Sequence, residues 1–139
     1  MSVELLAKSA LVYGLVLWAG GLIHLTFAAI PETRILDDRL VRLRMMAGMM
    51  KRYNPLAWTA IPVLTVSATY LALMKNMGFP EAAALTTLYT ALALDFVHSF
   101  VYGPRAAKGD VKARRTAFNI ARVEVPLVVA LPLLLTMLM

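Results

Sequence analysis

The feature that most constrains this sequence is the recurrence of four apolar segments, each about as long as a bilayer is thick. They cover residues 9–30, 55–74, 81–102 and 118–139. About 20 apolar residues in a helix cross the hydrocarbon core of a membrane. The chain has 139 residues and is 60% hydrophobic, more than a soluble domain of this size can bury. We therefore predict an all-α integral membrane protein, a single-domain four-helix bundle with up-down-up-down order.

Positive charge is concentrated between these segments. Of 14 Lys and Arg residues, six lie in residues 31–54 and five in residues 103–117, whereas the turn between the second and third segments holds only Lys75. The positive-inside rule places both basic loops in the cytoplasm and both termini outside, in a multi-pass protein of the cell membrane. Topology and lipid headgroups explain a net charge of +6, so we expect no nucleic-acid partner.

The first basic loop also carries an apolar pattern. Residues 32–52 keep apolar side chains at helical spacing, which predicts a short amphipathic helix on the membrane surface. This segment contains the run Met45, Met46, Met49 and Met50. Thioethers favour Cu(I), but methionine is also an ordinary filler of amphipathic surfaces.

Other chemistry is restricted by what the sequence lacks. With no cysteine, disulfides, thiolate metal sites and cysteine nucleophiles are excluded. There is no phosphate-binding loop, nucleophile elbow or zinc-protease spacing, so an ATPase, kinase or serine hydrolase is unsupported. Whether the protein is an enzyme stays open.

The two halves of the chain share a weak repeat. Its two histidines, His24 and His98, are 74 residues apart, and each precedes a proline at the inner end of its segment. An arginine and two prolines follow each basic loop at offsets of 70 or 71 residues. Two similar hairpins in one orientation would form parallel repeats. Chance alignment of apolar helices is the alternative.

The two histidines are the strongest candidates for chemistry. Each lies one to two turns inside the expected cytoplasmic end, so the imidazoles would share one depth and could hold a metal or a haem iron from diagonal helices. Gly20 and Gly21 would let a flat macrocycle approach, and Arg34 and Arg105 would meet its propionates. Simple interhelical hydrogen bonds are the alternative.

Three charged residues of the third and fourth apolar segments also need an explanation. Asp95 precedes His98 by three residues and shares its helix face, where it could orient the imidazole, relay a proton or bind a cation. A pairing with Arg122 is the alternative. For Arg122 and Glu124, snorkelling or pairing near the interface is a sufficient explanation.

The pattern resembles that of a known family. The segment LVLWAGGLIHLTFAAIP, a charged stretch, HSFVYGPRAAKG and a final apolar helix are similar to the copper-resistance protein D-like superfamily of small membrane proteins, and more distantly to the haem-containing protoporphyrinogen oxidase type. The resemblance implies a four-helix unit associated with copper uptake or haem b, with His24 and His98 as candidate ligands. The chain lacks the His-rich external segments expected of a dedicated copper importer. It also lacks a basic residue deep in the fourth segment, which argues against the oxidase type.

These observations lead to three hypotheses. The first is a haem b-binding electron-transfer protein or small subunit of a membrane redox complex, with His24 and His98 as axial ligands. The second is a transporter of copper or another small solute. The third is a structural subunit without its own cofactor. The lipid bilayer is the expected partner, and subunits of a membrane complex or further copies of this chain stay open.

Overall fold

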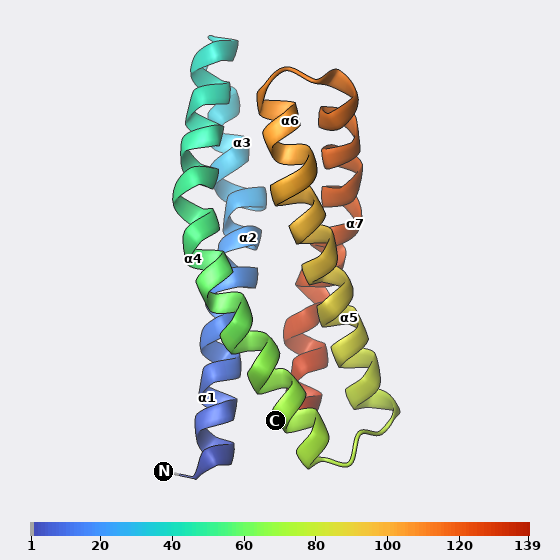
Figure 1. The fold of residues 1–139 in the computed structure, drawn as a ribbon. Helices are drawn as coiled ribbons and strands as arrows, with labels where there is room; N and C mark the ends of the chain where they lie inside the picture. The colour runs from blue at the N-terminus through green and yellow to red at the C-terminus, as the bar shows by residue number, and fades with distance from the viewer. Residues whose placement is uncertain (1) are drawn as a thin grey trace.

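The computed structural model describes residues 2–139 and shows four long antiparallel helices (Figure 1). Both ends of the chain lie at the same end of the bundle. The first helix runs through α1 (Val3–Leu15), the π-helical turn η1 (Val16–Gly20), α2 (Gly21–His24), the π-helical turn η2 (Leu25–Ala29), α3 (Ile30–Glu32) and the 3-10 turn η3 (Thr33–Ile35). The others are α4 (Arg39–Met74), then α5 (Phe79–Phe96) with the π-helical turn η4 (Val97–Tyr102) and α6 (Gly103–Ala107), and finally α7 (Val111–Leu135) with the 3-10 turn η5 (Thr136–Leu138).

All four helices are long and apolar enough to cross a bilayer. Many large apolar side chains point outward, including Val66, Phe79 and Leu133, which are more than two-thirds exposed. Lipid is the solvent that favours such a surface. The predictions of an all-α four-helix bundle and of a multi-pass membrane protein are therefore confirmed.

The helices begin where the sequence supplies capping groups. The Asp38 carboxylate accepts hydrogen bonds from the backbone N–H groups of Leu40 and Val41, and Asp110 accepts one from Ala113. A side-chain oxygen at this position satisfies donors that the first helical turn leaves free. The helices α4 and α7, which begin within the two basic segments, thus start in the same way.

The expected surface helix does not form as a separate element. Instead, α4 continues without a break from Arg39 through Pro55 to Met74, a length of 36 residues, or about 54 Å at 1.5 Å per residue. The hydrocarbon core is only about 30 Å thick, so the basic first part of α4 projects beyond it. The second apolar segment begins at Pro55, but in the structure Pro55 lies inside α4, where it removes one hydrogen bond without ending the helix.

The helices pack as two hairpins. The first helix packs mainly against α4, and α5 packs mainly against α7. The hairpins meet in a core that includes Leu64, Leu88 and Leu131, all fully buried, in the half of the bundle near the chain ends. Towards the basic-loop end, Figure 1 shows α2, α3 and α4 standing apart from α6 and α7.

Each hairpin's first helix contains a π-helical turn at a matching position. The turns η2 and η4 both end two residues before a proline, Pro31 and Pro104. Proline lacks an N–H and its ring crowds the carbonyl four residues earlier, so the backbone adjusts in the preceding turn. This shared distortion supports the predicted repeat.

Candidate metal centre

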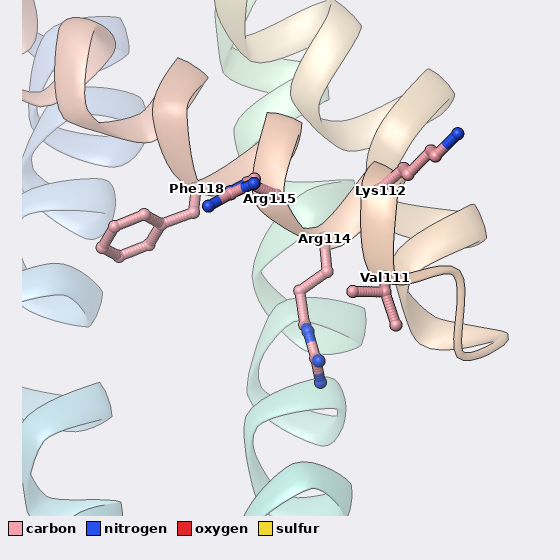
Figure 2. A pocket seen from close by; sticks show the side chains of 5 residues that line it. All are labelled: Val111, Lys112, Arg114, Arg115 and Phe118. Carbon is pink, nitrogen blue, oxygen red and sulfur yellow. The ribbon is translucent and has the colours of Figure 1, made fainter.

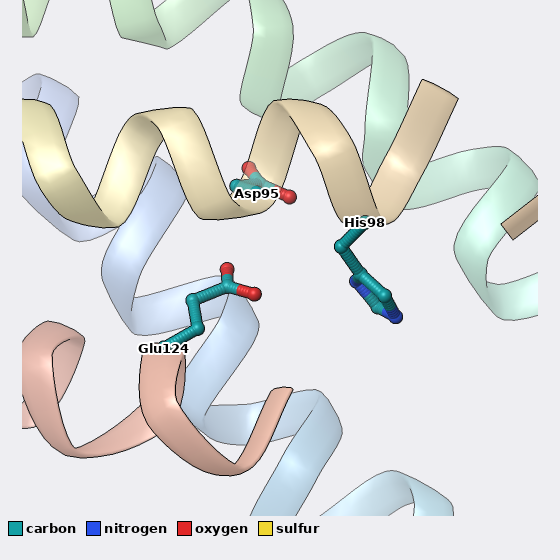
Figure 3. A group of neighbouring side chains, drawn as sticks. All are labelled: Asp95, His98 and Glu124. Carbon is teal, nitrogen blue, oxygen red and sulfur yellow. The ribbon is translucent and has the colours of Figure 1, made fainter. Parts of the chain in front are cut away.

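Three side chains of types that bind metals, all from the second hairpin, meet inside the bundle. Asp95 and His98 come from the third helix and Glu124 comes from α7, and one ligand atom of each lies within 4.8 Å of the other two. Figure 3 shows the carboxyl groups of Asp95 and Glu124 facing one another, with the imidazole of His98 beside them. Ligands on opposite sides of a zinc-sized ion are at most about 4.4 Å apart, given bonds of about 2.0–2.2 Å. The three groups are therefore close to coordinating distance.

Asp95 is held in place from two sides. Its Oδ2 accepts a 2.8 Å hydrogen bond from the indole Nε1 of Trp18, across the bundle on the first helix. Its Oδ1 accepts a 3.0 Å hydrogen bond from the Ser99 hydroxyl, one turn further along its own helix. Trp18 is itself fully buried, and its backbone carbonyl accepts a hydrogen bond from the Tyr53 hydroxyl. Asp95 is thus a buried and oriented carboxylate.

Glu124 is the less satisfied of the two carboxylates. It is 1% exposed, and its Oε1 has no hydrogen-bond partner among the described residues. Within residues 2–139 the one ion pair joins Glu4 to Lys8, so neither carboxylate of the cluster is paired with a lysine or arginine. A buried acceptor with no partner costs about 1–3 kcal/mol, and more for a charged group. The cluster therefore has a free acceptor oxygen that a proton or a cation could bind.

His98 owes its position to the π-helical turn η4. The backbone N–H of Gly103 bonds to the carbonyl oxygen of His98, five residues earlier. A Cβ at Gly103 would lie only 2.9 Å from that oxygen, so only glycine fits there without a shift. Pro104 then follows without an N–H of its own. Such turns insert one extra residue and occur frequently at functional sites.

A cavity of about 580 Å³ leads from the basic-loop end to this cluster. His98 and Glu124 line its inner part, and its walls are mainly apolar, with Leu22, Leu25 and Val125 among them. Along α7 the cavity follows one helix face from Arg114 to Glu124, a distance of about 15 Å at 1.5 Å per residue. The cluster is thus reached from one end of the bundle.

The structure separates the two histidines. The side chain of His24 is exposed on the outer face of the first helix, whereas His98 lines the cavity. The residues that the first helix buries include Leu11, Trp18, Leu22 and Leu25, and His24 is off this face. Ligation of one iron by both histidines inside a single chain is therefore not the arrangement that the structure shows.

Of the other residues predicted to bind the cofactor, some line the cavity and some do not. Arg34 and Arg105 are both exposed, but only Arg34 lines the cavity. Gly20 is exposed with open space around its Cβ position. A Cβ at Gly21 would lie 2.3 Å from a ring carbon of Tyr53, so Gly21 serves helix packing rather than a macrocycle.

Two residues of the predicted methionine run line the cavity, and Glu124 is an addition to the predicted site residues. Met46 and Met50, one turn apart, line the same cavity as His98. Glu124, explained from sequence by its place near the interface, is instead a buried member of the cluster. Arg122 is exposed, with its guanidinium 4.9 Å from the ring centre of Phe118, and does not pair with Asp95. Two residues along a helix are about 200° apart, which explains why Arg122 and Glu124 face opposite ways.

Comparisons with protein-family models, with curated proteins and with solved structures found no match for this chain. The function is therefore argued from the geometry of the site.

Proposed function

We propose that this protein binds a transition-metal cation inside the membrane, with Asp95, His98 and Glu124 as ligands, and that it acts in metal uptake or handling. The observation that carries the proposal is the meeting of two unpaired buried carboxylates and an imidazole at the end of a cavity. Two carboxylates this close repel each other in a medium of low dielectric constant unless a cation or a proton neutralises them. A metal ion would relieve this repulsion and give Glu124 a partner.

Copper is the metal that the surroundings favour. Imidazole suits copper, zinc, iron and nickel, and Cu(II) binds most tightly of these to a given set of nitrogen and oxygen ligands. The thioethers of Met46 and Met50 line the approach, and such ligands select Cu(I). The resemblance to the copper-resistance protein D-like superfamily points to the same metal. Copper would be the cargo of a transport function rather than a resident cofactor.

The test is a metal titration of the purified protein, with the two histidines as a matched pair. Parent protein and the variants His98→Ala, Glu124→Gln and His24→Ala are titrated with Cu(II) by calorimetry in detergent. We expect one site in the parent and in His24→Ala, and at least about tenfold weaker binding in the other two, since a residue that touches the metal contributes at least as much as one that only orients a ligand. Equal binding by His98→Ala and His24→Ala would refute the proposed site.

Haem b is the second candidate, and His98 is the residue that would hold its iron. The observation that favours it is the apolar cavity with His98 at one end and Arg34, Arg42 and Arg114 at the other, since arginines pair with carboxylates such as propionates. A haem held here would support electron transfer. The same preparations test this candidate, because bound haem gives a Soret band that His98→Ala would remove. If neither metal nor haem binds, the third hypothesis, a structural subunit, is favoured.

We also propose the predicted orientation in the cell membrane, with the basic loops in the cytoplasm. Its support is the concentration of 11 Lys and Arg residues in residues 31–54 and 103–117. In this orientation the cavity opens towards the cytoplasm.

A further inference from the structure

Three arginines from three different segments surround the outer end of the cavity. Arg34 belongs to η3, Arg42 to the first turn of α4 and Arg114 to the first turn of α7. None of them has an acidic partner within 4.0 Å among residues 2–139, where Glu4–Lys8 is the one ion pair. Their charges are therefore not neutralised by the protein.

Arg42 is the arginine of the three whose side chain the protein holds in a defined place. One of its terminal nitrogens, Nη2, donates a 2.6 Å hydrogen bond to the backbone carbonyl of Leu36, which holds the side chain in place. Its Nε is buried and has no hydrogen-bond partner in the described part of the chain. A guanidinium fixed in this way has a donor left for an anion, and phosphate suits its planar geometry.

Arg114 lies at the junction of several hollows. It borders the cavity, a groove of about 630 Å³ between the two basic loops, and a surface hollow of about 600 Å³ at the start of α7. Figure 2 shows the side chains of Lys112, Arg114 and Arg115 spreading in different directions from the first turns of α7, with Phe118 beside Arg115. Of these basic side chains, Arg114 lines the cavity, whereas Lys112 and Arg115 line the adjacent surface hollow.

We infer that the cavity holds an anionic phospholipid from the leaflet at the basic-loop end, with its phosphate on Arg34, Arg42 and Arg114 and one acyl chain along α7. Basic pockets between membrane helices bind such headgroups. The distance of about 15 Å from Arg114 to Glu124 gives an acyl chain a path along α7, with Ala117 and Ala121 as small residues beside it. The lipid would close the entrance to the metal site from the basic-loop end.

The lipid inference depends on the cavity and not on the metal site, so the lipid proposal and the metal proposal can fail separately. A lipid here excludes the haem candidate, because the same arginines would hold the propionates.

The experiment measures retained lipid. Protein is purified from membranes containing phosphatidylglycerol, delipidated with detergent, and analysed by native mass spectrometry. The test variant is the double change Arg42→Gln and Arg114→Gln. Its matched control is the double change Arg44→Gln and Arg115→Gln, the same charge change on neighbouring residues that do not line the cavity. We expect one retained phosphatidylglycerol in the parent and the control, and a loss of about fivefold per cavity arginine in the test variant.

A cavity-filling variant separates chain binding from simple surface attraction. Ala121→Leu keeps all three arginines but occupies the path of the chain, and we expect it to lose the retained lipid. Three results would each overturn the inference: equal retention in the two double variants, equal retention of phosphatidylcholine, or unchanged retention in Ala121→Leu. A Soret band that disappears with the cavity arginines would overturn it as well, since haem would then hold the cavity.

Discussion

At the scale of single residues, the site depends on which way each side chain points around its helix axis. The distance of a histidine from the next proline sets its depth, and this distance is nearly the same for His24 and His98, seven and six residues. It does not set the direction. Asp95 and His98 continue the buried face of Ala84, Leu88 and Ala91, whereas His24 is off the buried face of its own helix. The buried face of each of these two helices can be recognised from its sequence, and this pattern distinguishes His98 from His24.

Glu124 illustrates the same point on α7. Its neighbour Arg122 suggested an interfacial pair, but the buried residues Ala117, Glu124, Val128 and Leu131 recur at helical spacing. A carboxylate in register with an apolar face is a signal for a buried site in a membrane protein. The hydrogen bond from Trp18 to Asp95 had no comparable signal, because it joins residues 77 positions apart on diagonal helices.

The indole of Trp18 gives a prediction at this scale. Trp18→Phe removes the donor to Asp95 Oδ2 but keeps most of the apolar volume. We expect about 1–3 kcal/mol lower unfolding free energy and about tenfold or more weaker Cu(II) binding, because outer-shell partners orient metal ligands. Thermal unfolding and calorimetric titration in detergent measure the two effects.

The control is the other tryptophan of the chain. Trp58 packs edge-on against Phe96 and Phe100, at centroid distances of 5.8 and 4.9 Å, and has no side-chain hydrogen bond among the described residues. Trp58→Phe therefore leaves metal binding unchanged. If both variants bind Cu(II) alike, Trp18 does not position Asp95.

At the scale of helices, their existence was predictable and their continuity was not. Hydropathy located all four spans, since it sums over about 20 residues. Local signals placed helix ends at Pro31, Pro55 and Pro104, yet helical structure continues past each of them. Proline removes one hydrogen bond, and in the membrane-spanning helices a π-helical turn or a neighbouring helix compensates. The projecting basic part of α4 follows from this continuity.

Close packing between the first helix and α4 gives a prediction for glycine. A Cβ at Gly14 would lie 2.8 Å from the Cβ and 3.1 Å from the Cα of Leu64. This Cα belongs to the backbone of α4 and cannot easily move. Gly14→Ala should force the two helices apart and lower the unfolding free energy by about 1–3 kcal/mol. Thermal unfolding of the purified protein in detergent measures this change.

Gly20 provides the same substitution on the same helix as a control. Nothing lies within 4 Å of its Cβ position. Gly20→Ala is therefore expected to be neutral or to stabilise the helix by up to about 1 kcal/mol, the difference in helix propensity. Equal melting temperatures for the two variants would show that the Gly14 contact is not tight.

At the scale of the whole molecule, the bundle is closed at one end and hollow at the other. Near the chain ends the hairpins share a core of fully buried leucines, including Leu88, Leu131 and Leu138. Towards the basic loops they enclose the cavity that ends at His98 and Glu124. This asymmetry is that of a site open to one side of a membrane. A transporter would need the hairpins to rock about the site so that it opens to the other side.

The chain contains no cysteine, so single cysteines can report this asymmetry. Ala121→Cys lies in the cavity and Leu131→Cys lies on the same helix in the closed half. A membrane-impermeant maleimide should label Ala121→Cys only from the side of the basic loops and Leu131→Cys from neither side. Vesicles of both orientations make the two sides accessible in turn.

Bound Cu(II) should slow labelling at Ala121→Cys, and replacing phosphatidylglycerol by phosphatidylcholine should speed it, because the lipid would no longer cover the entrance. Labelling from the side of the chain ends would instead show that the leucine core opens, and that the site is reached from the opposite side.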